Sequence, residues 1–361
     1  MASAAFKSAL IRAFGSPAIV IDLGVVERNI ARVQAACDAA GVANRPHIKT
    51  HKSPLIAAMQ REAGAKGITC QKLGEAEVMA DGGLDDILIS YNILGEDKVA
   101  RLGCLLSRAQ VMVAADNPVT VAGLPMAGEI AGRPLPVVVE CDTGRKRAGV
   151  ETPGEAIALA RQIAASPHLS FAGLLMYPPE DRWPQTQSFV NEVRQTLRAE
   201  GLEMKIISTG GTPNMTHLGQ LEGATEHRAG TYIFNDRMMM ACAQATLADC
   251  ALQVYTTVVS RAAPERGILD AGSKTLTADP GGGLDGYGLI LEHPMARIHK
   301  FAEEHGFLDL AACNERPDVG DIVRVIPNHV CVVCNMVDRY VAVRGEEIIG
   351  EIPVAARGRL S

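Results

Sequence analysis

A lysine flanked by two histidines is the first feature of the sequence that could do chemistry. His47, Lys49 and His51 alternate within the segment Arg45-Pro-His-Ile-Lys-Thr-His-Lys52. On a strand these three side chains would share one face, and the inward face of a barrel strand is normally apolar. An amine held there among other cations has a reason to be deprotonated and nucleophilic, as a Schiff base requires. The alternative interpretation is a solvated basic face.

A glycine-rich turn offers a place for a phosphate group. In Ser208-Thr-Gly-Gly-Thr-Pro213, the small residues Gly210 and Gly211 let backbone N–H groups approach an anion, and Thr212 can add its hydroxyl. The turn follows the seventh strand of the barrel predicted below, which is the usual phosphate site of such barrels. A second glycine-rich stretch, Gly281-Gly-Gly-Leu-Asp-Gly-Tyr-Gly288, lacks the flanking strand and helix of a phosphate loop, so we interpret it as a surface loop.

A histidine and two cysteines lie close together in Pro327-Asn-His-Val-Cys-Val-Val-Cys334. The segment follows an apolar strand, and on a continued strand His329 and Cys331 would point the same way, which suits two ligands of one ion. Cys331-x-x-Cys334 also has the spacing of half a zinc site or of a redox pair, but the chain has no second such pair. From the residues alone, buried cysteines are the default interpretation.

Bulk composition excludes several classes of function. The net charge is −6 and the basic residues are scattered, so nucleic acid is not expected as a partner. Apolar runs are shorter than the roughly 18 residues of a membrane span, and no membrane partner is expected. Nine cysteines, an odd number, do not resemble a disulfide framework, which favours a reducing, cytoplasmic location. Residues 5–14 form a surface helix or, as the weaker alternative, a targeting peptide.

The elements that must position these residues alternate between short β-branched runs and amphipathic stretches of helical length. This βα alternation runs from residue 44 to about 235 and predicts a (β/α)8 barrel, because the number of candidate strands is eight. The candidate strands are 47–50, 67–71, 86–91, 110–115, 136–141, 169–177, 205–209 and 229–234. The lysine segment then ends the first strand, where barrel enzymes place their chemistry.

The pattern changes after about residue 250 to strands and turns without long helices. The candidate strands there are 252–260, 267–270, 321–327, 339–343 and 347–353. We therefore predict a barrel domain over residues 17–245 and a C-terminal β domain over residues 250–361. Residues 1–16 are expected to pack on the β domain.

Three stretches of the sequence resemble the D-threonine aldolase and D-serine dehydratase family. They are Arg45–Pro54, Gly67-Ile-Thr-Cys-Gln-Lys-Leu-Gly-Glu-Ala76 and Gly83-Leu-Asp-Asp-Ile-Leu-Ile-Ser90, and the similarity extends from Pro17 to Arg357. The resemblance implies an alanine-racemase-like barrel of fold type III that binds pyridoxal 5′-phosphate (PLP). It also implies that Lys49, and not Lys52, carries the cofactor as a Schiff base. From the residue pattern we add His47 to the catalytic group.

The same resemblance assigns further cofactor contacts. Arg147, in Asp142-Thr-Gly-Arg-Lys-Arg-Ala-Gly149, matches the arginine that the family directs at the PLP ring, whereas Arg145 and Lys146 have no counterpart. Tyr177 matches a tyrosine near the ring, and Tyr232 matches one that contacts the phosphate; an exposed turn and a core tyrosine are the alternatives for Arg147 and Tyr232. The sequence departs from the family after Tyr177, where it continues Pro178-Pro-Glu-Asp-Arg182 instead of the common His and Gly.

The family also binds a divalent ion through His-x-Cys or His-x-Asp in the C-terminal domain, which makes His329 and Cys331 the expected ligands. Cysteine at the second position is dehydratase-like and favours zinc, whereas aspartate is aldolase-like and favours harder ions such as Mn²⁺ or Mg²⁺. In the opposite sense, Cys70-Gln-Lys72 is aldolase-like.

The expected substrate is a D-β-hydroxy-α-amino acid, such as D-serine, D-threonine or 3-hydroxyaspartate. We favour β-elimination to a keto acid and ammonia over retro-aldol cleavage to glycine and an aldehyde. A racemase and a non-catalytic PLP-binding protein are further alternatives. The family implies a homodimer with the active site at the interface.

Overall fold

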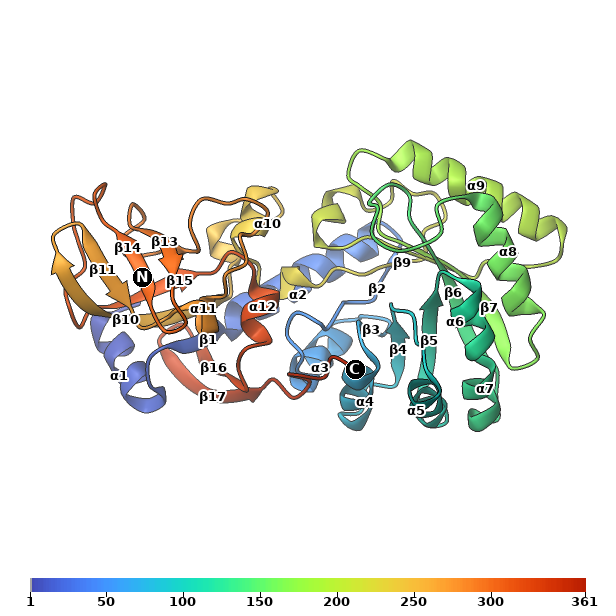
Figure 1. Cartoon of the computed structure of the whole chain (residues 1–361), viewed down its shortest axis with the longest axis horizontal. Coiled ribbons are helices and arrows are strands. Elements are labelled where there is room, and N and C mark those ends of the chain that lie inside the picture. The colour runs from blue at the N-terminus through green and yellow to red at the C-terminus, as the bar shows by residue number, and fades with distance from the viewer. Residues whose placement is uncertain (1) are drawn as a thin grey trace. The chain divides into compact units, whose positions relative to one another are not determined.

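The computed structural model describes residues 2–361 and divides the chain into two compact units. A barrel unit contains residues 31–49, 54–230 and 358–361. A β unit contains the chain up to residue 30, residues 50–53 and residues 231–357. The helix α2 (Leu23–Ala39) contributes to both. Figure 1 shows the elements of each unit.

The barrel unit is built on eight parallel strands in the order β2-β9-β8-β7-β6-β5-β4-β3. Beyond β2, His47 forms a bridge to Thr69, and its amide donates to the carbonyl of Ala229 at 2.9 Å. The first strand segment therefore pairs on both sides and closes the curled sheet. The strands are β2 (Ala43–Asn44), β3 (Ile68–Cys70), β4 (Asp86–Ile89), β5 (Gln110–Ala115), β6 (Leu135–Cys141), β7 (Leu169–Met176), β8 (Ile206–Thr209) and β9 (Glu226–His227).

Helices connect most of these strands, as the predicted βα alternation requires. They are α3 (Pro54–Glu62), α4 (Leu73–Asp81), α5 (Glu96–Leu106), α6 (Pro118–Gly123), α7 (Pro125–Ala131), α8 (Pro153–Ala164) and α9 (Trp183–Ala199). Local sequence explains where α8 begins: Thr152 accepts from the amide of Glu155, whose carboxylate accepts from the amide of Thr152, and Pro153 takes the first helical position. After strand β8 the chain forms a short 3-10 helix, η1 (Thr212–His217).

The β unit combines both ends of the chain in one sheet. Strand β1 (Ala18–Asp22) pairs antiparallel with β10 (Leu252–Ala263) and parallel with β16 (Arg339–Arg344). The other strands are β11 (Arg266–Leu269), β12 (Leu289–Ile290), β13 (Arg297–Phe301), β14 (Gly306–Asp309), β15 (Ile322–Ile326) and β17 (Glu347–Pro353). The remaining helices are α1 (Ala4–Phe14), α10 (Arg237–Ala241), α11 (Ser273–Leu276), α12 (Val330–Cys334), and the 3-10 helices η2 (Thr231–Ile233) and η3 (Leu247–Asp249).

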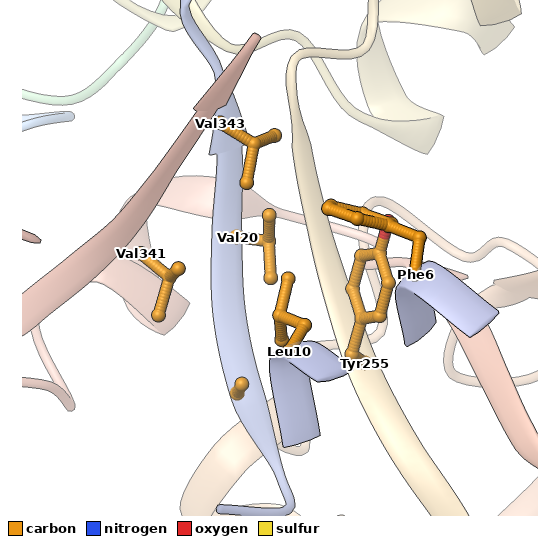
Figure 2. Close-up of a cluster of buried hydrophobic side chains, with 7 residues drawn as sticks. Phe6, Leu10, Val20, Tyr255, Val341 and Val343 are labelled. Carbon is orange, nitrogen blue, oxygen red and sulfur yellow. The ribbon is translucent and has the colours of Figure 1, made fainter. Parts of the chain in front are cut away.

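Helix α1 packs on this sheet through one apolar face. Figure 2 shows Phe6 and Leu10 against Val20 and Tyr255, with Val341 and Val343 in the same buried cluster. Because Phe6 and Leu10 are four residues apart, they lie on one side of the helix. The N-terminal residues thus belong to the core of the β unit.

Two predicted strands at the seam of the barrel are misplaced. The first strand lies at β2 rather than 47–50, and residues 48–51 form a turn; the eighth lies at β9 rather than 229–234, where η2 forms instead. The shared strand face predicted for His47, Lys49 and His51 is therefore wrong. Residues 330–334 are also helical rather than extended, so His329 and Cys331 are not strand neighbours. Among residues 2–361, no helix is long and apolar enough to cross a membrane.

The barrel interior contains a buried ion pair beside its apolar core. The core cluster consists of Leu88, Met112, Ala114, Val138 and Leu175. Arg45 Nε lies 2.8 Å from Glu226 Oε2, and Arg45 Nη1 lies 2.6 Å from Asp86 Oδ1. The side chains of Arg45 and Glu226 are 3% and 0% exposed, so each charge depends on its partner for compensation.

The pair generates a stability prediction. Arg45→Met should lower the free energy of unfolding by about 3–5 kcal/mol, because the Glu226 charge would stay buried without its cation. The control is Arg108→Met, which breaks a pair with Asp81 whose side chains are 46% and 67% exposed, and this change should cost less than about 1 kcal/mol. Urea unfolding followed by circular dichroism measures both. Equal losses in the two variants would contradict the assignment.

Candidate active site

His47 lies at the centre of the polar end of the barrel unit. Its Nδ1 lies 3.4 Å from the Lys49 amide nitrogen, which donates to it, and its Nε2 lies 3.1 Å from Gln71 Oε1. With Nδ1 as acceptor, the network assigns the ring proton to Nε2. Burial, together with the positive charge of Lys49 and more weakly of Arg228 and Arg147, holds the pKa of His47 well below its usual range. Neutral His47 is thus surrounded by three cationic side chains.

Lys49 lies in the turn that directly follows the His47 bridge, and it is partly buried. The positive charge of Lys49 acts on His47 from this turn and not from a strand face. From the sequence we expected the lysine amine among other cations, whereas His47 is held neutral and is not one of them. The charges of Lys49 and Arg147 thus both act on His47, and we refer to these residues as the His47–Lys49–Arg147 cluster.

Arg228 is a member of this cluster that the sequence analysis missed. Its guanidinium donates to Ser208 Oγ at 2.6 Å and to the Met176 carbonyl at 2.9 Å. Burial lowers the pKa of Arg228 to about 10, while the carboxylates of Glu226 and Glu140 act in the opposite direction. The sequence did contain a signal for Arg228, because it lies two positions after Glu226 and would share a strand face with it. The eighth strand was predicted to begin at residue 229, so neither residue was included in it.

Arg147 reaches the cluster from the loop after β6. Its amide donates to Asp142 Oδ2 at 2.7 Å, and its guanidinium lies 3.7 Å from Glu140 Oε1. The guanidinium is also 5.6 Å from the centre of the Tyr177 ring. Burial raises the pKa of Glu140 against the influence of Arg147. Since the Arg147 side chain is 60% exposed, it can turn toward a ligand bound beside Tyr177.

The turn after β8 has the features of a phosphate cradle. Gly210 has φ +75°, and a Cβ there would lie 1.9 Å from the His227 ring, so only glycine fits. A Cβ on Gly211 would lie 3.0 Å from the Tyr177 ring. Among the backbone–backbone hydrogen bonds outside helices and strands of residues 2–361, none has the amide of Gly210 or Gly211 as its donor. Thr212 Oγ1 accepts from the Gly230 amide at 3.2 Å and so fixes the turn. These residues fit a phosphate group that receives backbone N–H donors.

Tyr232 lies in η2 and is 1% exposed. It belongs to the β unit, whereas Gly210, Gly211 and Thr212 belong to the barrel unit. Its role as a phosphate contact therefore remains a prediction.

The β unit contains a histidine and a cysteine arranged as ligands of one ion. His329 precedes α12, and its Nδ1 lies 3.1 Å from Asp236 Oδ2. Asp236 is fully buried and also accepts from the Val330 amide at 3.0 Å. A carboxylate on Nδ1 leaves Nε2 available for a metal ion and fixes the ring orientation. Asp236 was missed because it lies 93 residues before His329 in the chain.

Cys331 completes the pair. Its Sγ lies 3.1 Å from Thr50 Oγ1, and Thr50 is the residue that follows Lys49 in the chain. Burial disfavours a charged His329, but Asp236 and Cys331 outweigh it and raise the pKa of His329 to about 10. The pair thus attracts positive charge and fits a divalent cation. Among the described residues, no third His, Cys, Asp or Glu joins these two in a metal-binding group. Two protein ligands leave open positions for water and substrate.

Two family models match consecutive parts of the chain. The alanine racemase N-terminal domain matches residues 21–238, and a serine dehydratase domain matches residues 251–343. A D-threonine aldolase from Arthrobacter sp is 35% identical over 356 residues, which cover 95% of this chain and 93% of the relative. The crystal structure of D-threonine aldolase from Filomicrobium marinum superimposes with a TM-score of 0.88 at 31% identity, covering 96% of each chain.

A third similar protein is a dehydratase. D-threo-3-hydroxyaspartate dehydratase from Delftia sp. HT23 superimposes with a TM-score of 0.86 at 29% identity, covering 94% of this chain and 97% of that one. Two further similar structures, also of a D-threo-3-hydroxyaspartate dehydratase, are a cysteine-to-alanine variant in the metal-free form and a histidine-to-alanine variant. The replaced histidine precedes the replaced cysteine by two residues. The predicted fold class is confirmed by these comparisons.

The phosphate cradle after β8 predicts that a methyl group added at Gly210 weakens cofactor binding. Gly210→Ala should weaken PLP binding at least about tenfold, because the added Cβ forces the His227 ring away and strains a left-handed backbone. Titration of the apoprotein with PLP, followed by visible absorbance, measures the affinity. Gly132→Ala is the control, since φ is +67° there but open space surrounds the site. Similar affinities for the two variants would contradict a cradle at Gly210.

The His329–Cys331 pair predicts that zinc binding depends on Cys331 but not on Cys334. Cys331→Ala should lower zinc affinity at least about tenfold, because only His329 would remain as a protein ligand. Cys334→Ala is the control, since Cys334 is fully buried beside Tyr340 and should leave zinc binding unchanged. Zinc bound per chain after dialysis against a competing chelator measures both. Loss of zinc from the Cys334 variant alone would reverse the assignment.

Proposed function

Since the chain belongs to the D-threonine aldolase and D-serine dehydratase family of PLP-dependent lyases, we propose that it cleaves D-β-hydroxy-α-amino acids with the help of a divalent metal ion. The observation that carries the proposal is the combination of the His47–Lys49–Arg147 cluster with the His329–Cys331 pair. Lys49 and Thr50 are consecutive residues, and Thr50 contacts Cys331.

PLP, when bound, acts as an electron sink for the bond broken at the substrate Cα. In the proposal, Lys49 holds the cofactor through its amine, while Gly210, Gly211 and Thr212 hold its phosphate. When not bonded to the cofactor, the Lys49 amine would be the base that removes the substrate α-proton. His47 stays neutral and orients the turn by accepting from the Lys49 amide. Tyr177, whose ring lies against Gly211, limits the space beside the cofactor.

A divalent ion at His329 and Cys331 would act as a Lewis acid on the substrate β-hydroxyl. The thiolate favours zinc, a borderline-soft ion, over Mn²⁺ or Mg²⁺. Asp236 engages His329 Nδ1, which would leave Nε2 as the nitrogen that binds the ion, and Thr50 Oγ1 lies 3.1 Å from the Cys331 sulfur.

Within this substrate class we favour dehydration, with a keto acid and ammonia as products. The support is the His-x-Cys spacing, which is also that of the two replaced residues in the D-threo-3-hydroxyaspartate dehydratase variants. Retro-aldol cleavage is the second candidate, supported by the 35% identity to the Arthrobacter aldolase and by Cys70-Gln-Lys72. The family also supports a homodimer in which each copy completes the active site of the other.

The reaction can be assigned with one incubation. We expect purified protein with PLP and zinc to convert D-serine and D-threonine to keto acids, because the ion assists departure of the β-hydroxyl. Keto acid, glycine and aldehyde are measured together, with Mn²⁺ in a parallel sample. Glycine and acetaldehyde from D-threonine, without keto acid, would replace dehydration by aldol cleavage. Lys49→Ala is the matched control and should lose both the turnover and the visible absorbance of bound cofactor.

Removing the metal with a chelator tests its role independently of PLP. Dialysis against EDTA should abolish turnover while the visible absorbance of PLP remains, because the metal and the cofactor have different ligands. Zinc added back should restore the rate. Full activity in protein shown to be metal-free would refute the role of His329 and Cys331.

A further inference from the structure

The four residues that follow the proposed cofactor lysine are fixed within the β unit. Residues Thr50–Ser53 are buried, and none of them is more than 4% exposed. The Tyr340 hydroxyl donates to the His51 carbonyl at 2.8 Å, and the Ala356 amide donates to the Lys52 carbonyl at 3.0 Å. Lys52 has a φ of +52°, a left-handed conformation that a lysine adopts only where its surroundings hold it. The segment is therefore a rigid part of the β unit.

Thr50 is the residue of this segment that contacts the proposed metal pair. Its Oγ1 lies 3.1 Å from Cys331 Sγ, and Thr50 is 0% exposed, so water cannot replace this hydrogen bond. With a thiol at Cys331, either atom can be the donor. A cysteine that binds a metal ion has lost its proton, so the Thr50 hydroxyl must then donate to the sulfur. Because a hydrogen bond to a charged acceptor is about twice as strong as a neutral one, metal binding would hold Thr50 more firmly.

Lys49 lies between two residues that limit its freedom. Its amide donates to His47 Nδ1 at 3.4 Å, which is a long hydrogen bond. Its carbonyl belongs to the planar peptide group that it shares with Thr50, so the Lys49 backbone cannot turn independently of Thr50. When one ligand has already ordered a segment, a second ligand loses less conformational entropy on binding there. An ion that holds Thr50 should therefore favour the binding of a cofactor at Lys49.

We propose that Thr50 is a positioning residue that couples the two cofactors, so that a divalent ion at the His329–Cys331 pair raises the affinity of Lys49 for PLP. The inference rests on the proposed function and concerns how its cofactors bind, not which bond is cleaved. Coupling between two binding sites is reciprocal, so PLP raises the affinity for the ion by the same factor. Chelation then weakens PLP binding without removing cofactor that is supplied in excess.

Titration of the apoprotein with PLP, with and without zinc, measures the coupling. Visible absorbance reports cofactor binding and requires no turnover. We expect zinc to lower the dissociation constant of PLP at least about fivefold, which is the lower end of typical couplings. Thr50→Val replaces the hydroxyl with a methyl group of similar size and should abolish this effect of zinc. Thr50→Ser keeps the hydroxyl and should keep the effect.

Thr256→Val is the matched control. Thr256 also lies in the β unit and is 0% exposed, and its Oγ1 lies 2.6 Å from Asp270 Oδ1. The variant loses a buried hydrogen bond that does not involve the metal pair, so zinc should retain its full effect on PLP binding. An equal loss of coupling in this variant would assign the effect to general destabilisation and overturn the proposal.

Reciprocity is tested in the unaltered protein. Zinc affinity, measured against a competing chelator, should rise with bound PLP by the same factor as PLP affinity rises with zinc. Independent binding of PLP and zinc, or an undiminished effect of zinc in Thr50→Val, would overturn the coupling through Thr50 and leave the proposed function intact. Failure of the wild-type protein to bind PLP or zinc at all would contradict the proposed function and this inference with it.

Discussion

A charge inside a barrel must have a counter-charge, and the barrel unit meets this requirement with alternating cations and carboxylates. Arg45 is paired with Glu226, and the carboxylates of Glu226 and Glu140 stabilise the positive charge of Arg228. The same field acts on His47, which stays neutral because burial and three neighbouring cations oppose its protonation. The chemistry assigned to Lys49 depends on this arrangement, since a neutral imidazole can accept from the Lys49 amide and a charged one cannot.

At the His329–Cys331 pair, the buried carboxylate of Asp236 determines the orientation of the His329 ring. Asp236 is held by the amides of Met239 and Val330, so its position does not depend on His329. Its Oδ2 engages Nδ1 of His329, which would leave Nε2 as the nitrogen available to a metal ion. The His47–Lys49–Arg147 cluster is thus controlled by neighbouring cations. The His329–Cys331 pair is controlled by one carboxylate, that of Asp236.

Much of the fold could be predicted from the sequence. Six barrel strands lie within about two residues of their predicted starts, because β-branched runs between amphipathic helices are a strong signal. The two strands at the seam are only two residues long and include Asn44, Glu226 and His227, whose polarity conceals them. The strands were predicted at nearby apolar runs instead, because the periodicity of apolar residues does not distinguish a buried strand from another buried segment. Lys49 and the glycine turn have local motifs, whereas Arg228 and Asp236 are recognised only through partners distant in sequence.

The position of β1 between β10 and β16 has a consequence for how the chain folds during synthesis. Residues 18–22 leave the ribosome early, but their pairing partners follow more than 230 residues later in β10 and more than 310 later in β16. Until then the apolar side chains of Ile19, Val20 and Ile21 have no sheet to join. Most of the barrel unit precedes residue 231 and can form first, because domains generally fold as units in order of synthesis; only its residues 358–361 follow later. The nascent chain must therefore keep an unpaired apolar strand from aggregating until β10 and β16 have been made.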